Sequence, residues 1–177
     1  MDRPSSFMTT KTLIPVEEYL RMQFDGADRD YVDGEVIERN MGETWHSRTQ
    51  KRLTLALAAF EMTLGVEMLV EIRIQINPQR YRVADLAVWR SSSEVGDPIP
   101  VLPPFLAIEI LSPEDRMSRM APRIRDYFDA GVEWVWLIDT EERIALVYSR
   151  QNPLGEAVAV LRTDNPVIEI PLESLLS

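Results

Sequence analysis

The sequence contains no cysteine, one histidine and two lysines among its 177 residues. Without cysteine there is no disulfide framework, zinc–thiolate site, iron–sulfur cluster or cysteine nucleophile. The single histidine, His46, excludes a multi-histidine metal site. Glycine-rich nucleotide-binding loops and the serine-elbow pattern are also missing. These absences leave carboxylates and arginines as the main candidates for chemistry.

Positive charge is scarce as well. The chain has 19 Lys and Arg residues against 29 Asp and Glu residues, a formal net charge of -10. This excludes a uniformly basic surface for nucleic acid, although it leaves room for a local basic patch. No apolar run approaches the roughly 20 residues of a membrane span, and the N-terminus lacks the apolar core of a secretory signal. We therefore expect a soluble, cytoplasmic protein, with residues 1–11 as a flexible tail and 12–177 as a single domain.

The hydrophobic pattern predicts a sheet combined with helices. Helical signals cover residues 15–22, 43–64 and about 112–131. Asp33-Gly34 lies between two strand-like runs, 29–32 and 35–39, which is typical of a β-hairpin. Further strands are expected at 66–76, 81–89, 105–111, 134–139 and 143–148, with short edge strands at 157–161 and 167–170. The order indicates a mixed α/β (α+β) domain around a central sheet.

Two carboxylates inside apolar strands are the most informative feature. Asp85 lies in the run 81–89 and Glu109 in the run 105–111. An ionised carboxylate without a partner is costly to bury, so each needs an explanation. If the two strands are neighbours, both side chains can meet on one side of the sheet and hold a hard cation such as Mg²⁺. The alternative is a strand end in water, or a buried ion pair with one of the 17 arginines.

Other candidate residues lie on the two long helices. His46, near the start of the first, is a candidate general base or water-positioning residue, and equally an ordinary surface residue. Arg116, Arg119 and Arg123 form one stripe on the second helix. Such a stripe suits contact with phosphates, or it is simply a solvated face. Residue spacing leaves these alternatives open.

Several short motifs occur in an order that resembles a known family. They are Asp33-Gly34-Glu35, His46, Arg82-Val83-Ala84-Asp85, Glu109-Ile110-Leu111-Ser112-Pro113, Tyr127 with Gly131-Val132, and Trp136-Leu137-Ile138-Asp139. The set resembles the Uma2 family, a branch of the PD-(D/E)xK nuclease superfamily, over about residues 12–175. The resemblance implies a restriction-endonuclease-like fold: a central mixed β-sheet flanked by helices, with an N-terminal helix and hairpin. It also implies metal-assisted hydrolysis of DNA.

The resemblance assigns roles to particular residues. It implies that Asp85 and Glu109 hold Mg²⁺ (or Mn²⁺), with Asp30 or Glu71 completing the acidic cluster. The lysine expected two residues after Glu109 is replaced by Leu111, and the matching position on the next helix is Arg123. An arginine can stabilise a phosphate or the transition state, but it cannot transfer a proton near neutral pH.

Three functional interpretations follow from these observations. The first is a Mg²⁺-dependent DNA endonuclease or nickase that uses Asp85, Glu109 and Arg123, with His46 orienting or deprotonating water. The second is a catalytically inactive, nuclease-derived module that binds DNA or protein, motivated by the missing lysine and the acidic charge. The third is a structural homodimer formed through the strand surface around Trp134. A homodimer is also expected for the nuclease.

Overall fold

A computed structural model describes residues 13–40, 43–91, 95–96, 98–112, 115 and 117–177. Within these residues the four helices are α1 (Val16–Tyr19), α2 (Thr44–Leu64), α3 (Met117–Ala130) and α4 (Leu172–Leu176). The strands are β1 (Asp30–Val32), β2 (Glu35–Ile37), β3 (Glu67–Asn77), β4 (Arg80–Trp89), β5 (Leu106–Leu111), β6 (Trp134–Asp139), β7 (Ile144–Ser149), β8 (Glu156–Ala157), β9 (Val160–Arg162) and β10 (Glu169–Pro171). The mixed α/β fold predicted from the sequence is confirmed.

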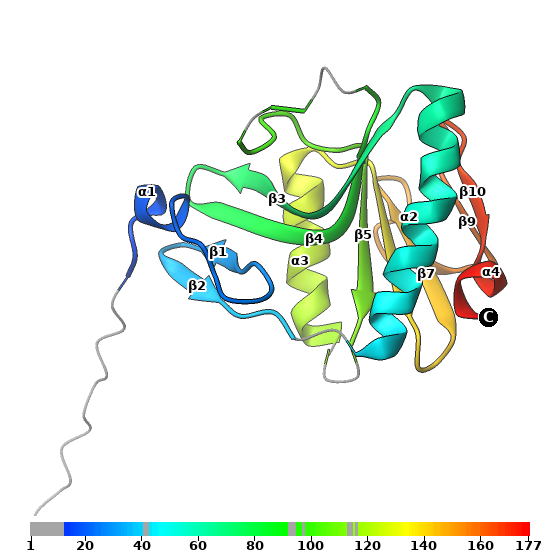
Figure 1. Ribbon diagram of the computed structural model, residues 1–177, viewed down its shortest axis with the longest axis horizontal. Helices are drawn as coiled ribbons and strands as arrows, with labels where there is room; N and C mark the ends of the chain where they lie inside the picture. Colours follow the sequence, from blue (N-terminus) through cyan, green and yellow to red (C-terminus); the bar gives the residue numbers. More distant parts are fainter. Residues whose placement is uncertain (1–12, 41–42, 92–94, 97, 113–114, 116) are drawn as a thin grey trace, which may run out of the picture.

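The N-terminal hairpin forms where Asp33-Gly34 predicted it. Both turn residues have positive φ, 52° at Asp33 and 94° at Gly34, as the tight turns favoured in hairpins require. The hairpin stands with α1 at one end of the molecule, far from the C-terminus (Figure 1). Three tyrosines, Tyr19, Tyr31 and Tyr81, form its small core. The turn chemistry therefore accounts for the antiparallel pairing of β1 with β2.

The main sheet has eight strands, ordered β2-β1-β4-β5-β6-β7-β8, with β3 paired to the other edge of β4. Only β5 and β6 are parallel among its pairs, as expected for strands joined through the crossover helix α3. β3 pairs with β4 along its length, so β1 and β5 must share the remaining edge of β4. β1 pairs with residues 80–81 and β5 with residues 86–88. Residues 82–85 of β4 therefore lie in a gap between two neighbouring strands.

Two apolar layers hold the helices against this sheet. On one face, Leu53 and Leu57 of α2 pack with β5 residues such as Ile108. On the other face, Met120, Ile124 and Tyr127 of α3 pack with alanines of β4 and β5. Small alanine side chains let α3 approach the sheet closely. The gap in β4 thus lies between α2 and α3 (Figure 1).

The C-terminal segment differs from the expectation in detail. Residues 157–161 and 167–170 were expected to be edge strands of the main sheet. Instead β9 and β10 pair with each other as a separate two-stranded sheet, and only the two-residue β8 extends the main sheet. The short helix α4, absent from the sequence prediction, buries Leu172, Leu175 and Leu176 against the α2-side core. A helix of five residues has too little periodicity to be recognised.

Candidate active site

The candidate site occupies the gap along β4, where side chains replace the missing strand partner. The backbone N–H of Val83 donates to Asp30 Oδ1 at 2.9 Å, and the Val83 carbonyl accepts from Arg123 Nη1 at 2.9 Å. Buried backbone polar groups need partners. Asp30, at the start of β1, and Arg123, on α3, therefore seal the gap in the sheet.

Three acidic residues form one row across β3, β4 and β5. Val70 pairs with Leu86 and Ile72 with Ala84, so Glu71 lies opposite Asp85. Leu86 pairs with Ile108, and one further step in that register places Glu109 opposite Asp85 on the other side. Like charges in directly opposite strand positions destabilise a sheet. The row therefore requires positive charge nearby.

The backbone is irregular at this row. Glu71 has a φ of 47°, a conformation uncommon for a residue other than glycine, asparagine or aspartate. On β4, Ala84 and Ala87 both pack on the α3 side, although residues three apart on a regular strand face opposite sides. The alternation of side chains between the two faces of the sheet is therefore interrupted at Asp85, whose carboxylate contacts His46 of α2. Strain of this kind costs about 1–3 kcal/mol and is common at functional sites.

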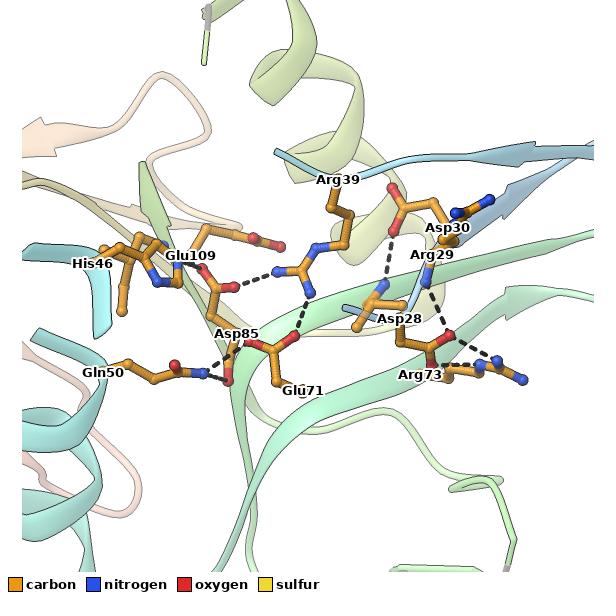
Figure 2. Close-up of polar contacts among 12 residues, drawn as sticks. Asp28, Arg29, Asp30, Arg39, His46, Gln50, Glu71, Arg73, Asp85 and Glu109 are labelled. Carbon is orange, nitrogen blue, oxygen red and sulfur yellow. Dashed lines mark hydrogen bonds and ion pairs between the residues drawn. The ribbon is translucent and has the colours of Figure 1, made fainter. Parts of the chain in front are cut away.

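Asp85 is almost completely buried, and its carboxylate has three partners among the residues that the structure describes. Its Oδ2 accepts the backbone N–H of Ile110 at 2.7 Å and lies 3.2 Å from His46 Nε2. Its Oδ1 is paired with the guanidinium of Arg39, which also pairs with Glu71 (Figure 2). Burial by itself would raise the pKa of Asp85, but the His46 hydrogen bond and the Arg39 charge outweigh it and hold the pKa below its ordinary value. Asp85 is thus an anion at neutral pH.

Glu109 is held from the opposite face of the sheet. Arg123 Nη1 lies 3.0 Å from Oε1, and the Tyr127 hydroxyl donates to the same oxygen. Burial raises the pKa of Glu109 to about 7; the Arg123 charge opposes this rise and the Asp85 charge adds to it. Within the described residues no hydrogen bond reaches the second oxygen, Oε2.

Asp30 fastens the hairpin to the rest of the site. Its Oδ2 accepts hydrogen bonds from Arg82 at 2.9 Å and Arg123 at 2.6 Å. Arg82 in turn is paired with Asp126 of α3 at 2.6 Å. Asp30 is 1% exposed, and removing one member of so buried an ionic network leaves an uncompensated charge. Its contacts are those of a positioning residue.

The site opens into a cavity of about 450 Å³. Acidic and basic side chains alternate on its wall, including Asp30, Arg39, His46, Asp85, Glu109, Arg119 and Arg123. Asp85 and Glu109 both line this cavity, but not from one side of the sheet as the sequence predicted. Asp85 is held from the α2 face and Glu109 from the α3 face, and each is paired with an arginine, the alternative that the sequence left open. A site of this volume suits a small ligand or part of a larger one.

A divalent cation fits the donor chemistry of this cavity. Mg²⁺ prefers oxygen ligands and usually binds through one or two carboxylates while keeping several waters. Within the described residues Glu109 Oε2 accepts no hydrogen bond, and Asp85 Oδ1 is bonded by Arg39 alone, so these are the two oxygens that could face a cation. In the described part of the chain no three His, Asp or Glu side chains are grouped closely enough to enclose an ion. In the absence of a third acidic ligand among the described residues, the positive charges next to the two carboxylates are the guanidinium groups of Arg39 and Arg123.

The predicted site residues do come together, but with more specific contacts than the sequence indicated. His46 contacts Asp85, and Arg123 is directed to Asp30, Glu109 and the Val83 carbonyl rather than outward. The stripe expected on α3 includes Arg116, which lies outside the described residues.

Sequence reasoning missed the roles of Arg39, Gln50 and Tyr127. Tyr127 lies four residues after Arg123 on α3, a spacing that places the two on one helical stripe and could have indicated their cooperation. Gln50 of α2 donates to Glu71 Oε1 at 2.9 Å and to the Asp85 carbonyl at 3.3 Å. Arg39 follows β2 and has no periodic signal of its own.

This fold, with acidic strand residues meeting in a cavity between two helices, is that of the restriction-endonuclease-like nucleases. The family model described as "Putative restriction endonuclease", Uma2, matches residues 16–175. The chain therefore belongs to the Uma2 family, as its motifs suggested.

A solved structure has the same fold. It is titled as a putative nuclease belonging to DUF820 from Anabaena variabilis ATCC 29413. The TM-score is 0.80 at 21% identity, over 92% of this chain and 97% of that one. A comparison with curated proteins gives no significant match. Family and fold together support a nuclease.

Among the helices in the described ranges, none combines the length and the apolar character needed to cross a bilayer.

Proposed function

We propose that the protein hydrolyses phosphodiester bonds in DNA, as an endonuclease or nickase, with Mg²⁺ or Mn²⁺ held by Asp85 and Glu109. The observation that carries the proposal is that these two buried carboxylates, on the neighbouring strands β4 and β5, line one cavity of about 450 Å³. A cation bound there supplies Lewis acidity toward the phosphate and lowers the pKa of an attacking water.

The surrounding residues position the two carboxylates. His46 Nε2 lies 3.2 Å from Asp85 Oδ2 and, with the Ile110 N–H, fixes the orientation of the carboxylate. Burial works to lower the pKa of His46, but its hydrogen bond with Asp85 and that residue's charge raise it above the ordinary value. His46 therefore holds a proton more readily than a free imidazole. Its role in orienting or deprotonating water stays a prediction.

Arg123 and Asp30 act as a pair in this proposal. Arg123 bonds Asp30 and Glu109 together through two nitrogens of one guanidinium, so the orientation of Glu109 depends on it. Arginine keeps the positive charge that the replaced lysine would supply, but not its ability to give up a proton. We therefore assign Arg123 to electrostatic stabilisation and positioning, and not to proton transfer.

The experiment is cleavage of supercoiled plasmid and of single-stranded DNA with Mg²⁺, Mn²⁺ or EDTA. Cleavage is expected with either cation, loss with EDTA, and loss by at least about 100-fold in Asp85→Asn and Glu109→Gln, because each removes an anionic ligand. Asp28→Asn is the matched control: Asp28 forms an equally close pair with Arg73 at 2.6 Å, outside the residues that line the cavity. Cleavage unchanged in Asp85→Asn would refute the proposal.

A catalytically inactive binding module is the second candidate. Pairing of Asp85 with Arg39, and of Glu109 with Arg123, is what a site without a cation would retain. This candidate predicts DNA or protein binding that EDTA leaves unchanged, with no cleavage under any cation. The net charge of -10 predicts weak nonspecific DNA affinity at physiological salt in either case.

A further inference from the structure

Arg39 supplies positive charge to the row of acidic residues formed by Glu71, Asp85 and Glu109. Its guanidinium is paired with both Asp85 and Glu71, two acidic residues directly opposite each other on β3 and β4. The Arg39 side chain is 11% exposed. The pKa of Arg39 is raised: burial opposes this, but the charges of Asp85, Glu109 and Glu71 outweigh it. The side chain is thus a permanent cation facing three carboxylates.

The contacts of Asp85 show what Arg39 blocks. Oδ2 is bonded by Ile110 and His46, whereas Oδ1 is bonded, within the described residues, by Arg39 alone. Arg39 thus covers the one oxygen of Asp85 that a metal ion could approach without breaking the bonds from β5 and α2. Figure 2 shows its guanidinium lying between the carboxylates of Asp85 and Glu71.

We propose that Arg39 is a built-in counter-cation that competes with the divalent ion for Asp85, and that its displacement sets the affinity of the site for metal. The inference rests on the proposed function. In the metal-free protein Arg39 removes the repulsion along the acidic row. When a cation binds, the Arg39 guanidinium leaves Asp85 Oδ1 and keeps Glu71 as its partner, because Glu71 is 38% exposed and lies toward the outside of the site.

The strained backbone at Glu71 agrees with this role. A left-handed conformation at a glutamate persists only where the surroundings enforce it. Here it places a second carboxylate on the same guanidinium as Asp85, while Gln50 holds the other oxygen of Glu71 at 2.9 Å. Glu71 therefore keeps the Arg39 guanidinium next to the proposed metal position after it has left Asp85.

The test measures metal binding, not cleavage. Isothermal titration with Mn²⁺ is carried out on EDTA-treated wild type, Arg39→Met, Arg39→Lys and Asp85→Asn. Arg39→Met is expected to bind Mn²⁺ about tenfold more tightly than wild type, the effect of freeing a carboxylate from one charge-assisted hydrogen bond. Arg39→Lys should lie between the two, because one ammonium cannot bridge both carboxylates as a planar guanidinium does. Asp85→Asn should lose binding.

Two control variants distinguish the displacement of Arg39 by the cation from the general effect of removing one positive charge. Arg119→Met removes one positive charge from the rim of the same cavity without freeing Asp85, and its Mn²⁺ affinity should change by less than about threefold, since Arg119 is exposed and screened. Arg73→Met breaks a comparable pair with Asp28 outside the cavity, and should leave Mn²⁺ affinity unchanged. An equal gain in Arg119→Met and Arg39→Met would overturn the proposal, because a general field effect would then explain it.

Thermal unfolding gives a second readout. Without metal, Arg39→Met should melt below wild type because Asp85 and Glu71 then face each other with no guanidinium between them, and Mn²⁺ should raise its melting temperature more than it raises that of wild type. If Arg39→Met does not fold without metal, the side-chain ¹⁵N resonance of Arg39 in the wild type supplies the test. It should shift on adding Mg²⁺, and should not shift in Asp85→Asn.

The outcomes distinguish this inference from the proposed function. Mn²⁺ binding in wild type that is lost in Asp85→Asn, with no gain in Arg39→Met, overturns the role of Arg39 and leaves the metal site in place. Absence of Mn²⁺ binding in wild type and in every Arg39 variant overturns both.

Discussion

Replacing Glu109 by glutamine should make the stability of the metal-free protein less dependent on pH. Burial raises the pKa of Glu109 from 4.5 to about 7, so the folded state keeps a proton that the unfolded state has already lost. Stability from this proton is fully present below about pH 4.5 and is lost as the pH rises to 7. This difference of about 2.5 between the folded-state and unfolded-state pKa of Glu109 corresponds to roughly 3 kcal/mol of unfolding free energy.

Glutamine keeps an oxygen for Tyr127 and Arg123 but does not titrate in this range. The wild type should therefore lose roughly 3 kcal/mol of unfolding free energy between pH 4.5 and 7.5 that Glu109→Gln does not lose. The assay is urea unfolding in EDTA at half-unit intervals of pH. Parallel stability curves for the two proteins would refute the reasoning.

The neighbouring groups contribute to the pH dependence in ways that can be told apart from that of Glu109. His46 has a raised pKa, so its stabilising contribution is present below pH 6.5 and is lost as the pH rises through the folded-state pKa. Asp85 has a lowered pKa, so its contribution is present above about pH 3.8 and is lost as the pH falls. Asp85 changes stability in the opposite sense, and the His46 contribution, which is lost only above about pH 6.5, is present in both proteins. A difference between the two stability curves therefore identifies Glu109 as its source.

Other predictions concern the hairpin, the ionic network and assembly. Asp30→Asn should destabilise the protein by about 3 kcal/mol in urea unfolding, because it unbalances a buried ionic network; a loss below about 1 kcal/mol would contradict the role given to it. Gly34→Ala should cost about 1–2 kcal/mol, since φ is 94° and a Cβ would lie 3.0 Å from Leu13; unchanged stability would show that the turn relaxes. A homodimer is expected by light scattering, and Trp134→Ala should weaken it if the β6 surface forms the interface, whereas a monomer at all concentrations would exclude that assembly.

Local features of the fold could be predicted from the sequence. The Asp33-Gly34 turn and the helix now called α2 have signals that depend only on adjacent residues, and both lie where expected. The two apolar strands β4 and β5 also lie within one residue of their predicted bounds. The carboxylates at Asp85 and Glu109 were conspicuous because their apolar neighbours require burial.

The break in alternation on β4 was not predictable. It depends on the gap between β1 and β5 and on the strained conformation at Glu71 across the sheet. The separate β9–β10 sheet was missed for the same kind of reason, since short strands choose partners by tertiary packing and not by local pattern.

The sequence alone therefore determined the family, the order of elements from α1 to β7 and the two acidic residues of the candidate site, because these follow from local patterns and ordered motifs. The tertiary structure decided which cations face those acids. Arg39, 46 positions from Asp85 along the chain, and Arg123, 93 positions from Asp30, have no periodic relation to their partners. Only the folding of β1, β4, β5 and α3 around one cavity brings these charges together, where low solvent exposure makes the pairing of each carboxylate decisive.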